Sequence, residues 1–253
     1  LRIPKVEFKD MEFVYAGAKE PALKDISFCA MAGQTIGVIG GTGSGKSTLV
    51  NLIPRFYDAA SGQVLVDGTD VKEYSLDELR DKTGVVPQKS VLFKGTLRDN
   101  MRWGKQDAWD EEIYRALDTA QAREFVDSKG EGLDLYIDQG GHNLSGGQRQ
   151  RLTIARALVR RPEILIMDDS ASALDFATDA KLRKAIRENT GDMTVFIVSQ
   201  RATTIKSADT ILVLDEGRLA GMGTHKELLK DCQVYREICL SQLSKEEVER
   251  DEQ

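Results

Sequence analysis

The order of apolar and polar side chains predicts two kinds of β-structure. Residues 6–13 alternate apolar with charged side chains, and residues 23–28 do so more loosely, which is the period of strands with one buried face. Continuous apolar runs occur later, at residues 164–167, 194–198 and 210–214. Such runs are typical of strands buried on both faces of a parallel sheet. We therefore expect an antiparallel β layer near the N-terminus and a mostly parallel core.

Helical spacing dominates the middle of the chain. Apolar side chains recur with the period of a helix within residues 96–101, 110–127 and 146–160, with few strand signals between them. Short strands are expected before this region, at residues 62–68 and 83–88, and a proline ends the second of them. The pattern predicts an α/β fold with an inserted α-helical subdomain.

The expected boundaries follow from these patterns. A core with its β layer is expected over about residues 1–88 and 157–243, and the helical subdomain over about residues 89–156. Residues 244–253 are mostly charged and are expected to form a frayed helix or a disordered tail. A length of 253 residues with 41% hydrophobic content fits one large α/β domain that carries an insert.

Composition narrows the classes of function. The net charge of -6, without a dominant block of Lys and Arg, argues against duplex nucleic acid as the main partner. No window approaches the roughly 18 to 20 apolar residues that span a membrane, and the N-terminus lacks the layout of a signal peptide. The chain as given is therefore expected to be soluble, and the missing initiator Met suggests a fragment of something longer.

Neither the cysteines nor the histidines suggest a metal site. Cys29, Cys232 and Cys239 are odd in number and lack the paired short spacing of zinc ligands, so we expect packed, free thiols in a reducing compartment. His142 and His225 are the only histidines, and other ligands do not accompany them. We expect both histidines in loops or on the surface.

The strongest chemical signal is a glycine-rich run that starts at Gly40. It fits the pattern G-x-x-x-x-G-K-[ST], follows an apolar run expected to be a strand, and precedes residues that favour a helix. In that context backbone N–H groups close around phosphates, Lys46 adds a charge at the β- and γ-phosphates, and Ser47 holds Mg²⁺. The expected phosphate-binding residues are Gly40, Gly41, Thr42, Gly43, Ser44, Gly45, Lys46, Ser47 and Thr48.

A second phosphate-reading element is expected further along the chain. Ser145, Gly146, Gly147 and Gln148 precede a helix-forming stretch over residues 149–158. The start of a helix presents N–H groups and the positive end of its dipole, so it can bind an anion. Ser145 also suits the N-cap of this helix, and the two roles are compatible.

The order of these motifs resembles the nucleotide-binding domain of an ATP-binding cassette (ABC) transporter, over about residues 5–240. The resemblance implies a P-loop NTPase fold with a RecA-like core, ATP and Mg²⁺ as ligands, and ATPase activity. It implies that Tyr15 stacks on adenine, that Gln88 senses Mg²⁺ and the γ-phosphate, and that Asp168 orients Mg²⁺. The implied Mg²⁺ site consists of Ser47, Gln88 and Asp168.

The resemblance also implies a partner domain. Residues 172–175 are similar to the D-loop, which in the family lies across a dimer interface. In the family, the signature residues 144–148 face a γ-phosphate on the P-loop of an opposing domain, so each ATP lies between two domains. The chain is thus expected to carry two half-sites and to need a second nucleotide-binding domain.

Two positions depart from the pattern of hydrolytic family members. Asp169 stands where these members carry glutamate, and Gln200 where they carry histidine. Asp169 shortens the reach of the carboxylate by roughly 1.5 Å, although a general base must touch its water, and a misplacement of about 1 Å can slow a reaction on the order of a hundredfold. Gln200 can donate a hydrogen bond but cannot become cationic. The expected catalytic residues are Lys46, Gln88, Asp169 and Gln200.

These substitutions are similar to those of the weakly hydrolytic, degenerate half of a heterodimeric ABC exporter. Residues 5–10, 91–100 and 223–228 resemble exporter cassettes, and residues 136–141 occupy the place of the coupling loop, with Gln139 where many members have glutamate. The resemblance implies a domain at the cytoplasmic face of the cell membrane, joined to the transmembrane domains of an exporter and paired with a non-identical domain. The intact signature of this chain would complete the catalytic site of that partner.

Three alternatives stay open at this point. A symmetric homodimer would hydrolyse ATP with Asp169 and Gln200 as they stand, and a regulatory module would bind ATP without turnover. A soluble cassette in DNA repair or translation would carry a long coiled-coil insert or a basic face, and the sequence has neither. A partner with glutamate and histidine at the two positions would favour the heterodimer.

Overall fold

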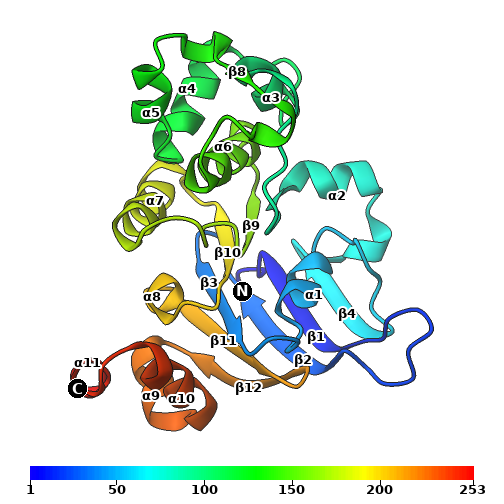
Figure 1. Ribbon diagram of the computed structural model, residues 1–253. Coiled ribbons are helices and arrows are strands. Elements are labelled where there is room, and N and C mark those ends of the chain that lie inside the picture. The colour runs from blue at the N-terminus through cyan, green and yellow to red at the C-terminus, as the bar shows by residue number, and fades with distance from the viewer. The chain divides into compact units, whose positions relative to one another are not determined.

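The N-terminal β layer is a four-stranded antiparallel sheet. The computed structural model describes residues 1–253, and this sheet lies in a first compact unit formed by Leu1–Thr83 and Asp192–Gln253. Its strands follow the order β2 (Leu23–Ala30), β1 (Val6–Phe13), β4 (Ser61–Val66) and β5 (Thr69–Asp70) (Figure 1). On its buried face Phe8 stacks on Phe28, with the ring centroids 4.6 Å apart. The alternation of apolar and charged residues at 6–13 therefore correctly indicated a strand of this antiparallel sheet.

The parallel part of the first unit is centred on β3 (Thr35–Gly40). Both of its neighbours, β10 (Thr194–Val198) and β11 (Thr210–Asp215), run parallel to it, and β12 (Arg218–Gly223) pairs antiparallel with β11. The side chains of β3, β10 and β11 are mostly buried, as their continuous apolar runs require. The sequence did not indicate β12, because its positions alternate between exposed and half-buried.

Short helices connect the strands of this unit. They are α1 (Lys46–Asn51) after β3, η1 (Val71–Glu73) and α2 (Leu76–Lys82) after β5, and α8 (Ala202–Ile205) after β10. A capping box fixes the start of α2, since Ser75 and Glu78 each satisfy a backbone N–H of the other. Because β3 and β10 are parallel, with Val38 opposite Val198, their carboxyl ends lie at one edge of the sheet.

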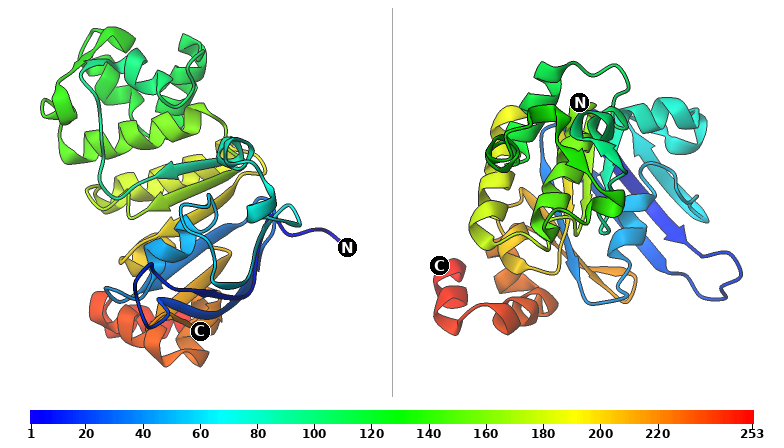
Figure 2. Two further views of the ribbon diagram at one scale, coloured as in Figure 1. Left: turned by 90° about the vertical axis from the view of Figure 1, so that its right-hand side faces the viewer. Right: turned by 45° about the horizontal axis from the view of Figure 1, so that its top comes forward.

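Three helices complete the first unit: α9 (His225–Asp231), α10 (Gln233–Gln242) and α11 (Lys245–Glu252). They pack together, and α9 also packs on β12 (Figure 2). Ser244 caps α11, and Val248 is fully buried. The charged end of the chain, expected as a frayed helix or a disordered tail, therefore forms a capped helix anchored by one apolar side chain.

His225 ties this last helix to the rest of the unit. Its Nδ1 is hydrogen-bonded to the hydroxyl of Tyr235 at 2.5 Å, and its Nε2 to Asp251 at 3.0 Å. The ammonium of Lys206 lies 3.2 Å from the same carboxylate. Burial acts to raise the pKa of Asp251, but the hydrogen bonds from His225 and Lys206 outweigh it and hold this pKa below its usual value. The expectation that His225 is a loop or surface residue was wrong.

The second compact unit, Gly84–Gly191, is mainly helical. Its helices are α3 (Leu97–Arg102), α4 (Asp110–Thr119), α5 (Arg123–Ser128), α6 (Gly146–Val159) and α7 (Phe176–Asn189), with the short turns η2 (Gly132–Asp134) and η3 (Gln139–Gly141). The strand β9 (Ile164–Asp168) lies beside β6 (Thr83–Val86), and β7 (Gly95–Thr96) pairs with β8 (Tyr136–Ile137).

One helix in this unit differs from the sequence analysis, and the unit takes in more of the chain than the expected helical subdomain. The helix expected at residues 110–127 is two helices, because Gln121 adopts a φ of 62° and turns the chain between α4 and α5. The unit also extends beyond residues 89–156, since it takes in β9 and α7. In the whole chain, no helix combines the length and the apolar character that crossing a membrane requires.

Candidate nucleotide-binding site

The glycine-rich loop connects the end of β3 to the start of α1. At Gly40 an added Cβ would lie 2.3 Å from the carbonyl oxygen of Leu214, so the loop approaches β11 more closely than any side chain allows. The ammonium of Lys46 donates hydrogen bonds to the carbonyl oxygens of Gly40 at 2.8 Å and Gly41 at 2.9 Å. The side chain of Lys46 therefore lies across its own loop, and these two hydrogen bonds hold its positive charge there.

The loop has the features of an anion cradle. An added Cβ at Gly41 or Gly43 would meet no atom within 4 Å, so this side of the loop is open. The hydroxyl of Ser44 is buried and has no hydrogen-bond partner in the chain, and a buried polar group without a partner is destabilising. Ser47 is exposed in the first turn of α1. An incoming phosphate with Mg²⁺ fits these groups.

Tyr15 lies beside this loop and is partly exposed to solvent. Its hydroxyl is hydrogen-bonded to the hydroxyl of Thr48, and its side chain is 39% exposed. The rings of Phe13 and Tyr57 meet it edge-on, with centroid distances of 4.7 Å and 5.5 Å. Such edge-to-face contacts are favourable, so Tyr15 is held in one orientation while exposing ring surface. Tyr57 carried no signal in the sequence, because its partners are distant along the chain.

Gln200 follows β10 at the same sheet edge as the phosphate-binding loop. The side chain of Gln200 is exposed. Its backbone carbonyl accepts a hydrogen bond from Nε2 of Gln242 at 2.6 Å, and Oε1 of Gln242 accepts one from the N–H of Ala202 at 2.7 Å. The end of α10 therefore fixes the backbone on both sides of Arg201.

In the second unit, Asp168 is the last residue of the strand β9 and Asp169 follows it. Asp169 has a φ of 51°, a left-handed conformation that is uncommon for residues other than glycine and better tolerated by Asp and Asn. The side chain of Gln88 donates to the Asp169 carboxylate at 3.4 Å. The structure thus brings together two of the residues that the sequence assigned to catalysis.

The signature residues form the capped start of α6. The hydroxyl of Ser145 accepts from the N–H of Gln148 at 3.1 Å, and the side-chain oxygen of Gln148 accepts from the N–H of Ser145 at 3.0 Å. This capping box uses the N–H of Gln148, while the N–H groups of the first turn have no partner within the helix. Gly146 and Gly147 therefore supply backbone donors without side chains at a helix start.

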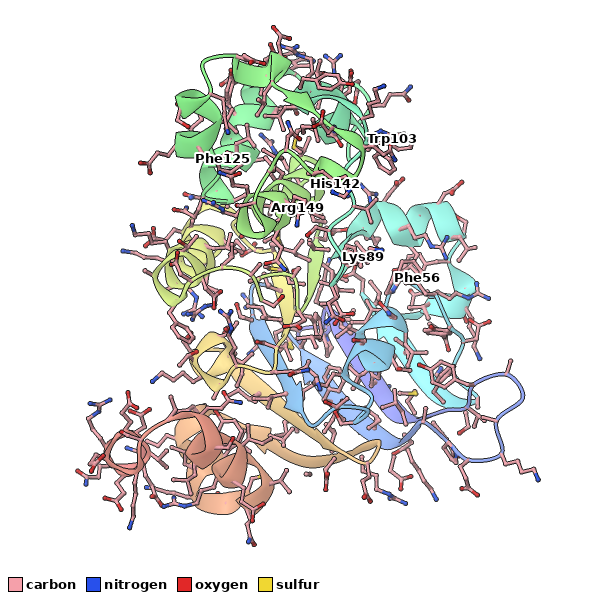
Figure 3. All side chains as sticks on the ribbon, in the orientation of Figure 1. Phe56, Lys89, Trp103, Phe125, His142 and Arg149 are labelled. Atoms are coloured by element: carbon pink, nitrogen blue, oxygen red, sulfur yellow. The ribbon has the colours of Figure 1, made fainter.

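Arg149 supports the loop that leads into this helix. Its guanidinium donates to the carbonyl oxygen of Leu144 at 2.6 Å and to that of Gly141 at 3.4 Å. Arg149 and the exposed His142 are both marked near the start of α6 in Figure 3. The sequence analysis did not single out Arg149, although its position next to Gln148 was a signal that could have indicated a structural role.

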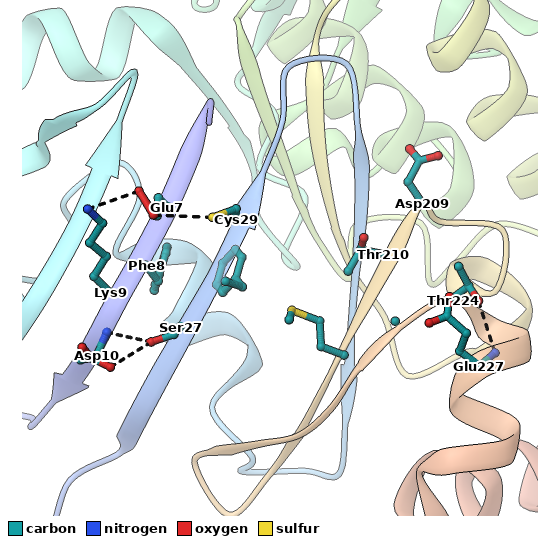
Figure 4. Close-up of a pocket in the computed structure, with 13 residues that line it drawn as sticks. Glu7, Phe8, Lys9, Asp10, Ser27, Cys29, Asp209, Thr210, Thr224 and Glu227 are labelled. Atoms are coloured by element: carbon teal, nitrogen blue, oxygen red, sulfur yellow. Dashed lines mark hydrogen bonds and ion pairs between the residues drawn. The ribbon is translucent and has the colours of Figure 1, made fainter. Parts of the chain in front are cut away.

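The cysteines are free, and one of them lines a surface hollow. Cys232 and Cys239 are buried, whereas Cys29 is exposed. A hollow of about 670 Å³ in the first unit is lined by Cys29, Glu7, Asp209 and Glu227 among others (Figure 4). Burial and the adjacent Glu7 carboxylate raise the pKa of the Cys29 thiol. The hollow contains none of the expected site residues.

Comparison with known proteins identifies the family of the chain. The family model described as ABC transporter matches residues 23–172. An uncharacterized ABC transporter ATP-binding protein of Mycobacterium tuberculosis is 49% identical over 233 residues, which is 91% of this chain and 40% of that protein. An ATP-dependent lipid A-core flippase of Haemophilus influenzae is 42% identical over 240 residues, 94% of this chain and 41% of that protein.

A solved structure also resembles the chain over nearly its full length. The structure of a bacterial Atm1-family ABC exporter with ATP bound matches with a TM-score of 0.90 and 37% identity, covering 96% of this chain and 42% of that one. The chain spans about two fifths of the length of its relatives. The similarity confirms the expected P-loop NTPase fold, with a mostly parallel sheet, an antiparallel sheet and helices. The chain therefore belongs to the ABC transporter family of ATPases and corresponds to the ATP-binding part of its relatives.

Proposed function

We propose that this chain binds ATP with Mg²⁺, pairs with a second nucleotide-binding domain, and powers an exporter. The single observation that carries the proposal is the open loop at residues 40–48, with Lys46 held across it and the buried Ser44 hydroxyl unpartnered. Relatives whose names describe a flippase and an exporter match the chain over most of its length. The domain would sit at the cytoplasmic face of the membrane, attached to the remaining part of such a protein.

The first unit supplies the grip on the nucleotide. The loop N–H groups and Lys46 bind phosphate oxygens, and the exposed ring of Tyr15 stacks on adenine. Mg²⁺, when bound, neutralises phosphate charge. Ser47 is the ligand proposed from this unit, and Gln88 and Asp168 are the ligands proposed from the second unit.

The division of the chain into a core and a helical subdomain, over about residues 89–156, is also part of this proposal.

The start of α6 supplies the half-site for a partner. Its backbone donors at Gly146 and Gly147 are directed by the capping box of Ser145 and Gln148, and a helix start favours an anion. A single chain would then hold one ATP on its own loop and contact the γ-phosphate of another through α6. Association of two domains is therefore required for a complete site.

Hydrolysis at this chain's own site is proposed to be weak. Asp169 brings a shorter carboxylate than glutamate would, and its contact with Gln88 is long at 3.4 Å. Gln200 can donate a hydrogen bond to phosphate but cannot carry a charge. The proposed partner is a non-identical domain whose site would be completed by the signature of this chain, and residues 136–141 are proposed to contact its membrane part.

The test measures ATP binding and ATP turnover on the purified chain over a range of protein concentrations. We expect Lys46→Ala to abolish binding, and the native chain to bind ATP but turn it over slowly. The double change Asp169→Glu plus Gln200→His should raise turnover by about tenfold or more, since placement within about 1 Å governs such rates. Turnover should also rise more steeply than concentration. Brisk turnover by the native chain would contradict a weakened site and leave a symmetric ATPase.

A further inference from the structure

We propose that Gln150 is a positioning residue that fastens the segment 172–175 to the start of α6, so that both meet an ATP-bearing partner as one body. The inference rests on the proposed function, because it assigns a role during association of two domains. All of these residues belong to the second unit. The link joins α6 to residues 172–175, which are separated along the chain by β9.

Both ends of the Gln150 amide are used in this link. Nε2 of Gln150 donates to the hydroxyl of Ser172 at 3.0 Å, and Oε1 accepts from the backbone N–H of Ala173 at 2.8 Å. The side chain is only 6% exposed, so water has little access to these groups. A buried amide with donor and acceptor both satisfied fixes its partners in place, whereas losing it leaves a backbone N–H unpaired.

The glycines of the signature make close contact with the same segment. An added Cβ at Gly147 would lie 3.3 Å from the carbonyl oxygen of Ala173, and one at Gly146 would lie 3.6 Å from the Cβ of Ala173. Leu174 is buried as well. The backbone donors proposed to face phosphate are therefore packed directly on the segment that Gln150 holds.

The far end of the segment is fixed by the next helix. Asp175 caps α7, and its carboxylate accepts from the N–H of Thr178 at 2.7 Å. Hydrogen bonds from Thr178 hold the pKa of Asp175 below its usual value. With Asp175 anchored to α7, the two hydrogen bonds from Gln150 join residues 172 and 173 to α6.

The chemistry of the link predicts which substitutions it tolerates. Gln150→Met keeps a side chain of similar length but removes both hydrogen bonds. Gln150→Glu keeps an acceptor for the Ala173 N–H and places its second oxygen beside the hydroxyl of Ser172, a group that can act as a donor. Thr153→Val is a matched control, because Thr153 is another buried polar residue of α6 whose hydrogen bond stays inside the helix, to the carbonyl of Arg149 at 2.9 Å.

The first experiment measures ATP-dependent association of the purified chain with itself by analytical ultracentrifugation, with a second copy of the chain in the place of the proposed partner domain. We expect Gln150→Met to weaken association by about tenfold or more, with the affinity of the separate chain for ATP unchanged. Gln150→Glu should restore most of the association, and Thr153→Val should match the native chain. Equal association of native and Gln150→Met chains, or an equal loss in Thr153→Val, would overturn the positioning role.

A mixed pair separates a role toward the partner from general stability. Chains carrying Lys46→Ala cannot hold ATP on their own loop, so a pair of one such chain with one Lys46 chain contains a single ATP. Gln150→Met should weaken the pair when it lies in the Lys46→Ala chain, whose α6 faces that ATP, and much less in the other chain. Equal loss in both arrangements would overturn the inference. Failure of the native chain to bind ATP would refute the proposed function itself.

Discussion

The phosphate-binding loop and the end of β9 are held in different ways. The loop is fixed by its backbone, since Gly40 packs against Leu214 with no room for a side chain and Lys46 donates to two loop carbonyls. Asp169 instead has a left-handed backbone and a half-buried carboxylate that Gln88 reaches at 3.4 Å. The part proposed to bind nucleotide is thus a tight turn, whereas the position proposed for hydrolysis depends on a less favourable backbone and a long contact.

Gln200, like Asp169, is held by weaker contacts than the loop is. The backbone around it is held by Gln242, a residue of α10 whose side chain is itself exposed. Hydrogen bonds that water can replace contribute less to stability than buried ones. The comparison teaches that substitutions in the loop should disturb the fold and binding together, whereas substitutions at the hydrolytic positions should leave the fold nearly intact.

The largest effect is expected in the loop, at Gly40. Gly40→Ala places a Cβ 2.3 Å from the Leu214 carbonyl and 2.6 Å from the Ser44 hydroxyl, so the loop must move. We expect a loss of about 3 kcal/mol in the free energy of unfolding, as for overpacking of a tight site, and loss of ATP binding. Gly41→Ala is the control, because its Cβ meets no atom within 4 Å. Chemical denaturation of both variants measures the difference, and equal stabilities would contradict a loop fixed by packing.

A smaller effect is expected at Asp169 and tests its backbone. At a φ of 51° alanine is strained and glycine is not. Asp169→Gly should therefore be more stable than Asp169→Ala by about 1 kcal/mol, the reverse of the usual order in helices. Both variants lose the carboxylate and should share the same low turnover. If thermal unfolding ranked alanine above glycine, the contrast between the two regions would lose its basis.

The smallest effect is a pH-dependent contribution of Asp251 to stability. We expect it to affect the region around Gln200 and not the loop at residues 40–48. The pKa of Asp251 is depressed in the folded chain, so its contribution is present above the unfolded value of about 3.9 and is lost as pH falls through the folded value. Asp251→Asn should lower stability by less than about 1 kcal/mol at neutral pH, and the difference from the native chain should shrink below pH about 4.

Hydrogen exchange followed along the chain gives the matching readout for this prediction. Amides of α11 and of the residues next to Gln200 should exchange faster in Asp251→Asn at neutral pH, since α10 carries Gln242 and packs with α9 and α11. Amides of the loop at residues 40–48 should not change. Faster exchange in the loop alone would contradict the prediction, because Asp251 would then stabilise the loop and not the region around Gln200.

Local patterns were sufficient for most of the fold. Strands buried on both faces were visible as apolar runs, because their burial leaves no choice of side chain. The break between α4 and α5 was missed because nothing in the local spacing shows that Gln121 takes a positive φ. The helix α11 was missed as an ordered element because its stability comes from Val248 and from a distant histidine.

The site divides in the same way. The glycine-rich loop and the capping box at Ser145 are set by residues close in sequence, so their spacing alone indicated them. Tyr57, Gln150 and Gln242 act through partners far along the chain. Such contacts depend on packing that a single sequence does not reveal, and for that reason the supporting residues came only from the structure.

One exposed thiol gives this chain a built-in handle for spectroscopy. Cys29 is open to solvent on β2, whereas Cys232 and Cys239 are buried. A maleimide dye should attach at a single place without prior removal of other cysteines, and because the raised pKa keeps the thiol protonated, mildly alkaline buffer would speed the reaction. No residue of the loop at 40–48 lines the hollow beside Cys29, so we expect that distances between labelled domains could follow their pairing without disturbing nucleotide binding.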